Sequence, residues 1–257
     1  MNKNSNFFIF KLGSSQRACL GYRQVILPVL ILALFVMNLF AVDLKSIYDI
    51  QFTMNAGFDG TYPSPYVNQT VIVQGVVTAI GFEGGRIFIS EPQGGAWSGI
   101  AVDGVGGRVS VGDFIEVQGR VSEIMGMTVI TNARNLRILL RNTPLPKPVS
   151  VSVHEALTSE AFESVLVRVS NLSSRNRTNG NFIAAVEDGT SSINIGNGFS
   201  ANISNLFSTG ENLDYVVGIV TFSFNRFSIH PRSSEDVGLV KTSVQASSWG
   251  RIKSLYK

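Results

Sequence analysis

An alternating strand with an internal glycine occurs twice in this chain, and it constrains the fold more than any other feature. In "VSVGDFIEVQGRVSE" (residues 109–123) apolar residues alternate with polar ones, and Gly119 stands inside the run. A period of two is typical of a β-strand, and an internal glycine marks a bulge or sharp bend. "DYVVGIVTF" repeats the pattern, with Gly218 in the place of Gly119. Strongly bent strands are typical of small closed barrels.

Five strand-like runs make up each copy of the pattern. The first set covers residues 70–81, 86–92, 98–104, 109–123 and 127–140, and the second covers 164–174, 181–189, 191–198, 213–224 and 226–231. Five bent strands in about 95 residues fit the OB-fold, whereas a β-sandwich usually needs about seven strands. The sequence therefore predicts an all-β protein with two tandem five-stranded OB-fold barrels.

A proline-rich connection separates the two copies. The predicted organisation is a signal peptide or membrane anchor over residues 1–41, a first OB-fold domain with an irregular lead-in over 42–140, a linker over 141–152, a second OB-fold domain over 153–237 and a basic C-terminal tail over 238–257. Residues 154–162 predict a short helix. Ser152 is its expected N-cap, because a hydroxyl can accept a bond from a free backbone N–H.

The N-terminal segment predicts export. "VILPVLILALFVMNLFA" (25–41) follows a basic leader and ends in a small residue, so we expect a signal cleaved after Ala41. An uncleaved anchor is the alternative, and the membrane is a partner only in that case. A spanning helix needs roughly 20 apolar residues, and Pro28 interrupts the run, which favours cleavage. Cys19 precedes the run, so the exported body would contain no cysteine and no disulfide.

The charge of the chain is divided unevenly. Of the 21 basic residues, eight lie in residues 1–41 or 238–257, and none of the 18 acidic residues do. The body between them therefore carries 13 basic and 18 acidic residues, a net charge of −5. An acidic body argues against tight nucleic-acid binding, which draws much of its affinity from neutralised phosphates.

The sequence resembles the OB-fold modules that accompany bacterial secreted nucleases of the YhcR-like group. In the first copy the resemblance rests on "SPYVNQTVIVQGVVTAI", "FISEPQGGAWSGIAV" and "VSVGDFIEVQGRVSEIMGMTVI", and in the second on "LPKPVSVSVHEA", "FESVLVRVSNLS" and "IHPRSSEDV". It covers residues 46–237. The second copy departs from the pattern at "SSINIGNGFS". In that family the modules flank a catalytic domain, which we do not expect here.

No catalytic or metal-binding constellation is predicted. The two histidines, His154 and His230, are far apart in the sequence and lack a partner at metal-ligand spacing, so we expect both on the surface. The Asp-Gly steps are accounted for by turns, and "AWSGI" lacks the Gly-x-Ser-x-Gly spacing of a nucleophile elbow. We therefore expect a protein that is not an enzyme and has no cofactor.

The candidate ligand-binding residues lie on the face that OB-folds use for oligonucleotides and oligosaccharides. This face consists of strands two and three with the loops that join strands one to two and four to five. The candidates on this face are Phe82, Arg86, Phe88, Trp97, Met125, Arg175, Arg177, Phe222 and Arg226, and Arg134 and Arg137 are added as a local basic cluster that could neutralise phosphates. Bases stack on rings while arginines follow phosphates. We expect Phe82 and Trp97, in glycine-rich loops, to be exposed, and Phe88 and Phe182 to belong to the core.

The predicted function is that of an exported, non-catalytic binding protein. The leading hypothesis is binding of single-stranded DNA or RNA as an accessory to extracellular nucleases, in the secreted, periplasmic or envelope compartment. The alternative is an oligosaccharide-binding or structural adaptor of the cell envelope, with envelope proteins as partners. The tail, with Trp249, Ile252 and Leu255 at three-residue spacing, is either a docking peptide or an ordinary frayed terminus.

Overall fold

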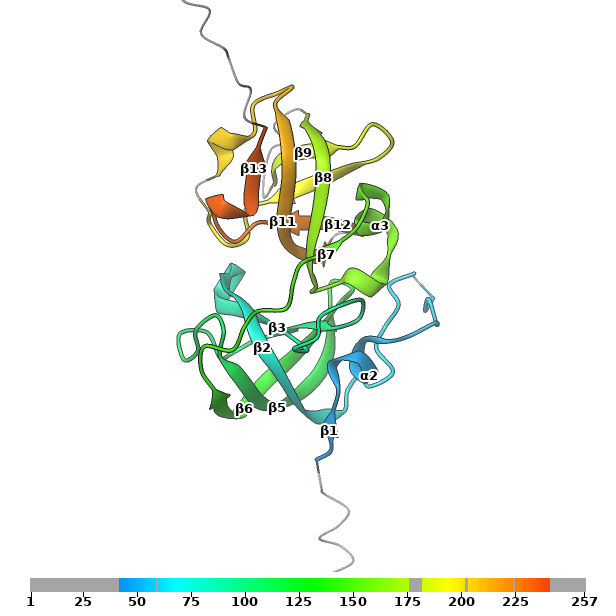
Figure 1. Cartoon of the computed structure of the whole chain (residues 1–257). Coiled ribbons are helices and arrows are strands. Elements are labelled where there is room, and N and C mark those ends of the chain that lie inside the picture. The colour runs from blue at the N-terminus through cyan, green and yellow to red at the C-terminus, as the bar shows by residue number, and fades with distance from the viewer. Residues whose placement is uncertain (1–41, 59, 176–181, 202, 224, 241–257) are drawn as a thin grey trace, which may run out of the picture. The chain divides into compact units, whose positions relative to one another are not determined.

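The computed structural model describes residues 42–58, 60–175, 182–201, 203–223 and 225–240. The apolar run before Val42, Cys19, Arg177, Phe224 and the tail from Lys241 lie outside these ranges. From Asp43 onward the chain forms one compact unit that holds two barrels (Figure 1). Among the described helices, none has the length and apolar composition needed to cross a membrane.

Barrel 1 is built from residues 44–140. Its elements are β1 (Leu44–Lys45), α2 (Ile47–Gln51), β2 (Thr70–Phe82), the 3-10 turn η2 (Glu83–Gly85), β3 (Arg86–Ser90), β4 (Gly99–Val102), β5 (Phe114–Ile124) and β6 (Met127–Leu140). Alternate residues of these strands, such as Val73, Ile115 and Val117, are fully buried in one apolar core. This is the one-sided burial that the period of two predicts.

Barrel 2 is built from residues 149–239. Its elements are β7 (Val149–Ser150), α3 (Val153–Thr158), η3 (Glu160–Phe162), β8 (Leu166–Ser174), β9 (Phe182–Glu187), β10 (Ser192–Gly196), η4 (Ser204–Leu206), β11 (Asn212–Ser223), β12 (Arg226–His230), η5 (Ser234–Asp236) and β13 (Val237–Leu239). It has a separate core, in which Ile193, Ile195 and Phe207 are among the most deeply buried side chains.

The two barrels share one strand order. Barrel 1 runs β2-β3-β4-β6-β5 and closes by pairing β5 with β2, while barrel 2 runs β8-β9-β10-β12-β11 and closes by pairing β11 with β8. In each barrel the third and fifth strands pair in parallel, and the other barrel pairs are antiparallel. This order is that of the OB-fold. The predicted all-β fold with two five-stranded barrels is therefore confirmed.

Gly119 and Gly218 occupy equivalent places, as the sequence repeat predicts. A Cβ on Gly119 would lie 2.3 Å from Cγ2 of Ile130, and a Cβ on Gly218 would lie 2.6 Å from Cγ2 of Ile229. Both isoleucines belong to the fifth strand of their barrel. The register between β5 and β6 also shifts at Gly119, so this glycine marks a bulge. Each glycine lets the fourth strand press directly against the fifth.

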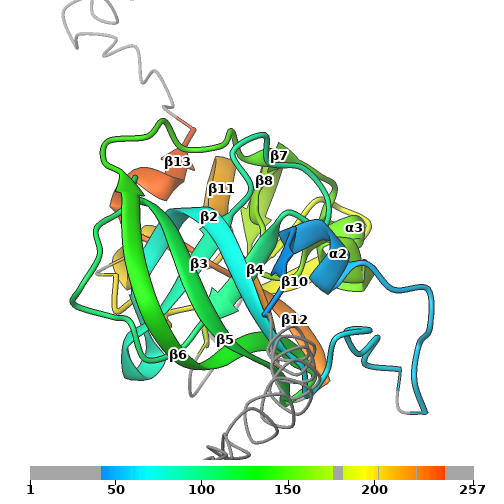
Figure 2. The same cartoon turned by 90° about the horizontal axis from the view of Figure 1, so that it is seen from below.

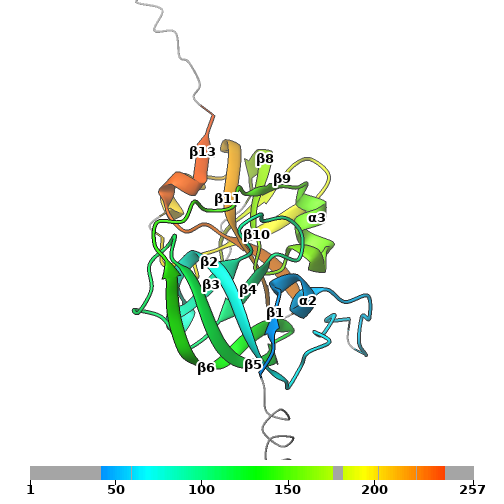
Figure 3. The ribbon, with the colours of Figure 1, turned by 60° about the horizontal axis from the view of Figure 1, so that its bottom comes forward.

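Each barrel is preceded by a short parallel strand and a short helix. β1 pairs with β2, and β7 pairs with β8 in the same way. Helix α2 contacts β2 and β4, and α3 contacts β10 and β12, so each helix covers its own barrel (Figure 3). The prediction of an irregular lead-in before residue 70 is therefore wrong at Ile47–Gln51. For α3 the prediction holds, with a capping box between Ser152 and Glu155.

An apolar interface joins the two barrels. From barrel 1 it contains Ala79, Phe82, Phe88, Ala101, Met127 and Val129, and from barrel 2 it contains Leu166, Val217 and Ile219. Phe82 lies at the centre, with ring centroids 5.3 Å from Phe88, 5.1 Å from Phe199 and 5.0 Å from His230. These edge-to-face contacts are a favoured arrangement of aromatic rings. Barrel 1 contributes strands one, two, three and five to this cluster, whereas barrel 2 contributes strands one and four.

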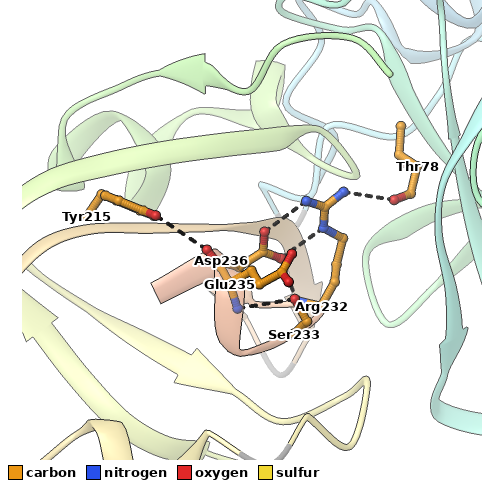
Figure 4. A network of polar contacts seen from close by, with 6 residues as sticks. All are labelled: Thr78, Tyr215, Arg232, Ser233, Glu235 and Asp236. Atoms are coloured by element: carbon orange, nitrogen blue, oxygen red, sulfur yellow. Dashed lines mark hydrogen bonds and ion pairs between the residues drawn. The ribbon is translucent and has the colours of Figure 1, made fainter. Parts of the chain in front are cut away.

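Hydrogen bonds supplement the apolar contact. Arg232, which follows β12, donates from Nε and Nη2 to the two carboxylate oxygens of Asp236 at 2.9 and 2.8 Å. Its remaining nitrogen, Nη1, donates to the Thr78 carbonyl of β2 at 3.1 Å (Figure 4). Because Asp236 fixes the guanidinium, the arginine reaches the other barrel in a single orientation.

Two ionisable groups are buried neutral in this interface. Burial, together with the neighbouring Glu160, raises the pKa of Glu163 well above its ordinary value. Glu163 is 2% exposed; its Oε1 accepts from the Thr128 N–H at 2.9 Å, and within the described residues its Oε2 has no partner. Burial and the charge of Glu123 raise the pKa of Glu160 to about 8. Burial lowers the pKa of His230 to about 4, so the prediction of a surface histidine is wrong there; His154 is exposed as expected.

These groups predict that stability falls as the pH rises above about 6.5. A raised carboxyl pKa stabilises the fold at low pH, and this contribution is lost as the pH rises through the folded pKa, about 8 for Glu160. The lowered pKa of His230 acts in the opposite direction, but only below its ordinary value of 6.5. We expect Glu163→Gln to reduce the decline in Tm between pH 6.5 and 9, because glutamine does not ionise. Each kcal/mol of unfolding free energy that the variant retains at high pH should raise Tm by about 2–4 °C.

The control for this measurement is Glu211→Gln, which replaces an exposed glutamate and should parallel the wild type. Equal slopes for Glu163→Gln and the wild type would contradict a raised pKa at Glu163.

Candidate functional site

The OB-fold binding face of barrel 1 is covered by barrel 2. Phe88 on β3 pairs laterally with Ala101 on β4, which pairs with Val129 on β6, and all three side chains are fully buried in the interface. Phe82 is 5% exposed, so the expectation that it is an exposed stacking ring is wrong. The glycines after it form η2, which turns the chain, while the ring itself packs on Phe88. The expected burial of Phe88 is confirmed.

Two further candidates at this face have different surroundings. Arg86 forms a bidentate ion pair with Asp103 at 2.7 and 3.1 Å, so its charge is already balanced. Met125 is 64% exposed, with a φ of 54° in the turn between β5 and β6. In barrel 1 the structure therefore does not assemble the predicted ring-and-arginine platform.

The equivalent face of barrel 2 is polar. The row that corresponds to Phe88, Ala101 and Val129 consists of Ala185 on β9, Asn194 on β10 and Ser228 on β12. Ala185 and Asn194 are only half-buried, and Ser192, two residues along the same face of β10, is exposed. Ser228 is buried, and His230 on the same face of β12 packs against Phe82 of barrel 1, so barrel 2 meets barrel 1 through β8, β11, Phe199 and this end of β12. The part of the face around Ala185, Ser192 and Asn194 remains accessible.

Two predicted arginines border the open face. Arg226 lies two residues before Ser228 on β12 and is exposed, so it projects on the same side of the sheet. Arg175, just after β8, is exposed and forms an ion pair with Glu187 of β9. Phe222 does not contribute, because it is 8% exposed and packs on Phe227 at 4.8 Å inside barrel 2. Arg177 and the side chain of Phe182 lie outside the part of the chain that the structure describes.

Arg134 and Arg137 lie on another surface of barrel 1. Both are exposed on the part of β6 that pairs with β5; Figure 2 shows these two strands side by side. Arg137 pairs with Glu116 at 2.9 Å. The structure therefore separates these arginines from the candidates of barrel 2.

A surface cluster of three rings was not predicted from the sequence. Tyr48 of α2 stacks on Phe52 with a centroid distance of 5.2 Å, and Phe52 meets Trp97 edge-on at 5.5 Å. Tyr48 is 43% and Phe52 39% exposed. The i, i+4 spacing of Tyr48 and Phe52 is the signal that sequence reading missed. We call these three rings the aromatic platform.

Trp97 occupies a strained position in this platform. Its φ of 64° is in the left-handed region, which a bulky residue adopts at a cost of about 1–3 kcal/mol. The backbone N–H of Trp97 donates to the Ala161 carbonyl of barrel 2 at 2.6 Å, and this hydrogen bond holds the conformation. The side chain is half-buried, so the predicted exposure is met in part. Backbone strain of this kind is concentrated at ligand-binding sites.

The described residues contain no group of three or more His, Cys, Asp or Glu side chains placed to hold a metal ion. His230 is engaged in structure, because its Nδ1 accepts from the Gly198 N–H at 3.1 Å and its Nε2 lies 2.9 Å from Ser228 Oγ. The accepting Nδ1 implies that Nε2 carries the proton and donates to the serine.

Comparisons with known proteins identify no family. No family model matches the chain, and no curated protein matches it. Among solved structures, the p204 HINb domain is similar at 12% identity and a TM-score of 0.33, over 61% of this chain and 90% of that one. A structure described as "Structural mimicry for functional antagonism" is similar at 10% identity and a TM-score of 0.33, over 64% of this chain and 89% of that one.

A third solved structure is a Replication Protein A heterotrimer bound to ssDNA. It matches at 12% identity and a TM-score of 0.26, over 67% of this chain and 51% of that one. At these scores the likenesses carry no argument about function. The assignment of the OB-fold rests on the strand order of each barrel.

The burial of Phe82 leads to a test of its role. We expect Phe82→Ala to lower the free energy of unfolding by about 3–5 kcal/mol, because it empties the centre of the interface. Urea denaturation measures this change. Phe58→Ala removes a fully exposed ring and should change stability by less than about 0.5 kcal/mol. A loss as small as this for Phe82→Ala would contradict the buried placement.

Proposed function

We propose that this protein is an exported, non-catalytic binding protein that holds single-stranded nucleic acid on the open face of barrel 2. The proposal rests on one asymmetry between the barrels. The apolar face of barrel 1 is buried where the barrels join, whereas the part of the equivalent face of barrel 2 around Ser192 and Asn194 is polar, accessible and bordered by arginines. Strands two and three are the part of an OB-fold that receives oligonucleotides.

The side chains on the open face suit the two parts of a nucleotide. Arg226 supplies an exposed guanidinium group, which can bind phosphate oxygens with two parallel hydrogen bonds, and Arg175 does so by exchanging its partner Glu187 for a phosphate. Asn194, between them on the sheet, offers an amide that can donate to and accept from the edge of an unpaired base. Such contacts favour a splayed single strand over a duplex, whose base edges are paired.

Acidic residues limit the strength of this binding. A groove of about 450 Å³ next to the face is lined by Glu187, Asp188 and Asp214 among others. Hydrogen bonds from Thr190 and Ser191 lower the pKa of Asp188 to about 2, so this carboxylate is charged at neutral pH. We therefore expect few phosphate contacts and affinities of micromolar order at low salt.

The proposal includes export and an accessory role. The basic leader and the apolar run of residues 25–41 support export. The resemblance to modules of secreted nucleases supports a role as an accessory protein of such an enzyme. We expect N-terminal sequencing of protein recovered outside the cytoplasm to begin at Val42. An intact Met1 start in the membrane fraction would establish an anchor instead.

Titration of a fluorescent oligothymidylate against the full chain at several salt concentrations tests the binding site. We expect Arg226→Ala and Arg175→Ala each to weaken binding and to reduce the slope of log K against log salt by about 0.7, the value for one phosphate of a single strand. Asn194→Ala should weaken binding without changing the slope, because it removes a neutral contact.

Arg108→Ala is the matched control, since it removes an exposed arginine from a loop of barrel 1. It should leave both affinity and slope unchanged. The proposal fails if the wild type shows no saturable binding at low salt. It also fails if Arg108→Ala has the same effect as Arg226→Ala.

A further inference from the structure

We propose that the aromatic platform of barrel 1 (Tyr48, Phe52 and Trp97) is a second binding site, and that its ligand is a neutral oligosaccharide. This site is independent of the open face of barrel 2, since it is formed by α2 and the loop between β3 and β4. The proposal rests on the arrangement of the rings, on the way the protein fixes them and on the charge that surrounds them.

The rings are directed outward by the geometry of α2. Ile47 and Ile50 are fully buried and attach the helix to the barrel, whereas Tyr48 and Phe52 point away from that core. The two rings lie within 9° of parallel, and Trp97 stands at 78° to Phe52. Large aromatic side chains at the surface of a soluble protein usually indicate an interaction site when they are contiguous. Three rings in contact satisfy this criterion.

The platform is held in place before any ligand binds. The Tyr48 N–H donates to Glu91 Oε1 at 3.0 Å, which ties α2 to the loop that carries Trp97. At the other end of this loop, Gln51 Nε2 donates to the Gly99 carbonyl at 2.6 Å. The Trp97 N–H is bonded to Ala161. Rings that are fixed in this way lose little conformational freedom when a ligand stacks on them.

Groups suited to hydroxyls lie beside the rings. A groove of about 380 Å³ is lined by Leu44, Lys45, Ser46, Gln74, Glu91, Pro92, Gln93 and Phe114. Glu91 lines the groove and also accepts from the Tyr48 N–H, so the groove lies beside the aromatic platform. The groove offers a carboxylate, two amides and a hydroxyl, which can donate to or accept from the hydroxyl groups of a sugar. The C–H groups of a sugar ring carry partial positive charge and fit the negative faces of aromatic rings.

The charge around the platform disfavours a phosphodiester. The acidic residues Asp49, on α2, and Glu91 lie next to the rings. Lys45, the cation of the groove, is paired with Asp43 at 3.4 Å and lies over the ring of Tyr66 at 5.5 Å. A nucleic acid would bring its phosphates toward uncompensated carboxylates, whereas a neutral sugar brings no charge. The observations therefore favour the oligosaccharide over a nucleic acid at this site.

The experiment uses tryptophan fluorescence of the full chain. The sequence contains two tryptophans, so Trp249→Phe leaves Trp97 as the single indole probe. The probes are neutral hexasaccharides of glucose, N-acetylglucosamine, xylose and mannose, with an oligogalacturonate and an oligothymidylate as anionic counterparts. We expect at least one neutral hexasaccharide to shift or quench the Trp97 emission saturably, and we expect an affinity that is independent of salt, since no ion is released.

Two variants assign the binding to the rings. Tyr48→Ala should weaken the hexasaccharide at least tenfold, while Phe58→Ala, a matched loss of an exposed ring in the same segment, should change the affinity less than twofold. Circular dichroism and the urea midpoint confirm that each variant is folded. Oligothymidylate binding should be unaffected by Tyr48→Ala, so this proposal and that for barrel 2 can fail separately.

Three outcomes would overturn the proposal. The first is that no neutral hexasaccharide changes the Trp97 emission saturably. The second is that Phe58→Ala weakens binding as much as Tyr48→Ala does. The third is that the oligothymidylate or the oligogalacturonate alone shifts Trp97, with an affinity that falls as salt is added, which would assign the platform to an anionic ligand.

Discussion

The packing of one barrel's binding face against its neighbour is the contact on which the rest of this structure depends. Phe82 and Phe88 are buried because β8, β11, Phe199 and His230 of barrel 2 cover them. The same contact brings Ala161 within reach of the Trp97 N–H, and it removes Glu163 and His230 from water. The apolar gain must exceed the cost of keeping these polar groups in a dry interface. Glu163 and His230 are buried in their neutral forms, because a charged group in this interface would need a partner of opposite charge.

This contact also divides the work between two similar barrels. A duplicated OB-fold has two copies of a ligand-binding face, but here one copy holds the molecule together and the other stays accessible. The change in role needs only a few substitutions. Where barrel 1 has Phe88, Ala101 and Val129 in a lateral row, barrel 2 has Ala185, Asn194 and Ser228. The two proposed sites differ accordingly, with arginines at one and rings beside carboxylates at the other.

The strand pattern allowed the fold to be predicted, because each strand buries one face and alternation reports this directly. The equivalence of Gly119 and Gly218 was also readable. The site was not predictable to the same extent. A phenylalanine in a glycine-rich stretch, such as Phe82, has the same local sequence whether it faces solvent or another barrel. The contacts that bury it come from residues more than 80 positions away, among them Phe199 and His230. The departure at "SSINIGNGFS" contained the missing information, since it places Asn194 where barrel 1 has Ala101.

The interface between the barrels is heterologous, since strands two, three and five of barrel 1 meet strands one and four of barrel 2, so the two barrels present different surfaces. A heterologous contact leaves the equivalent surface of the second barrel unpaired; repeated with the same geometry, it builds a closed ring or an open-ended array. The accessible face of barrel 2 is the place where a third barrel would dock. At that place the side chains of Asn194, Ser192 and Arg226 are polar, whereas docking in the manner of barrel 1 would require an apolar row. The polarity that makes this face available to a ligand thus also opposes the docking of another barrel in the same way.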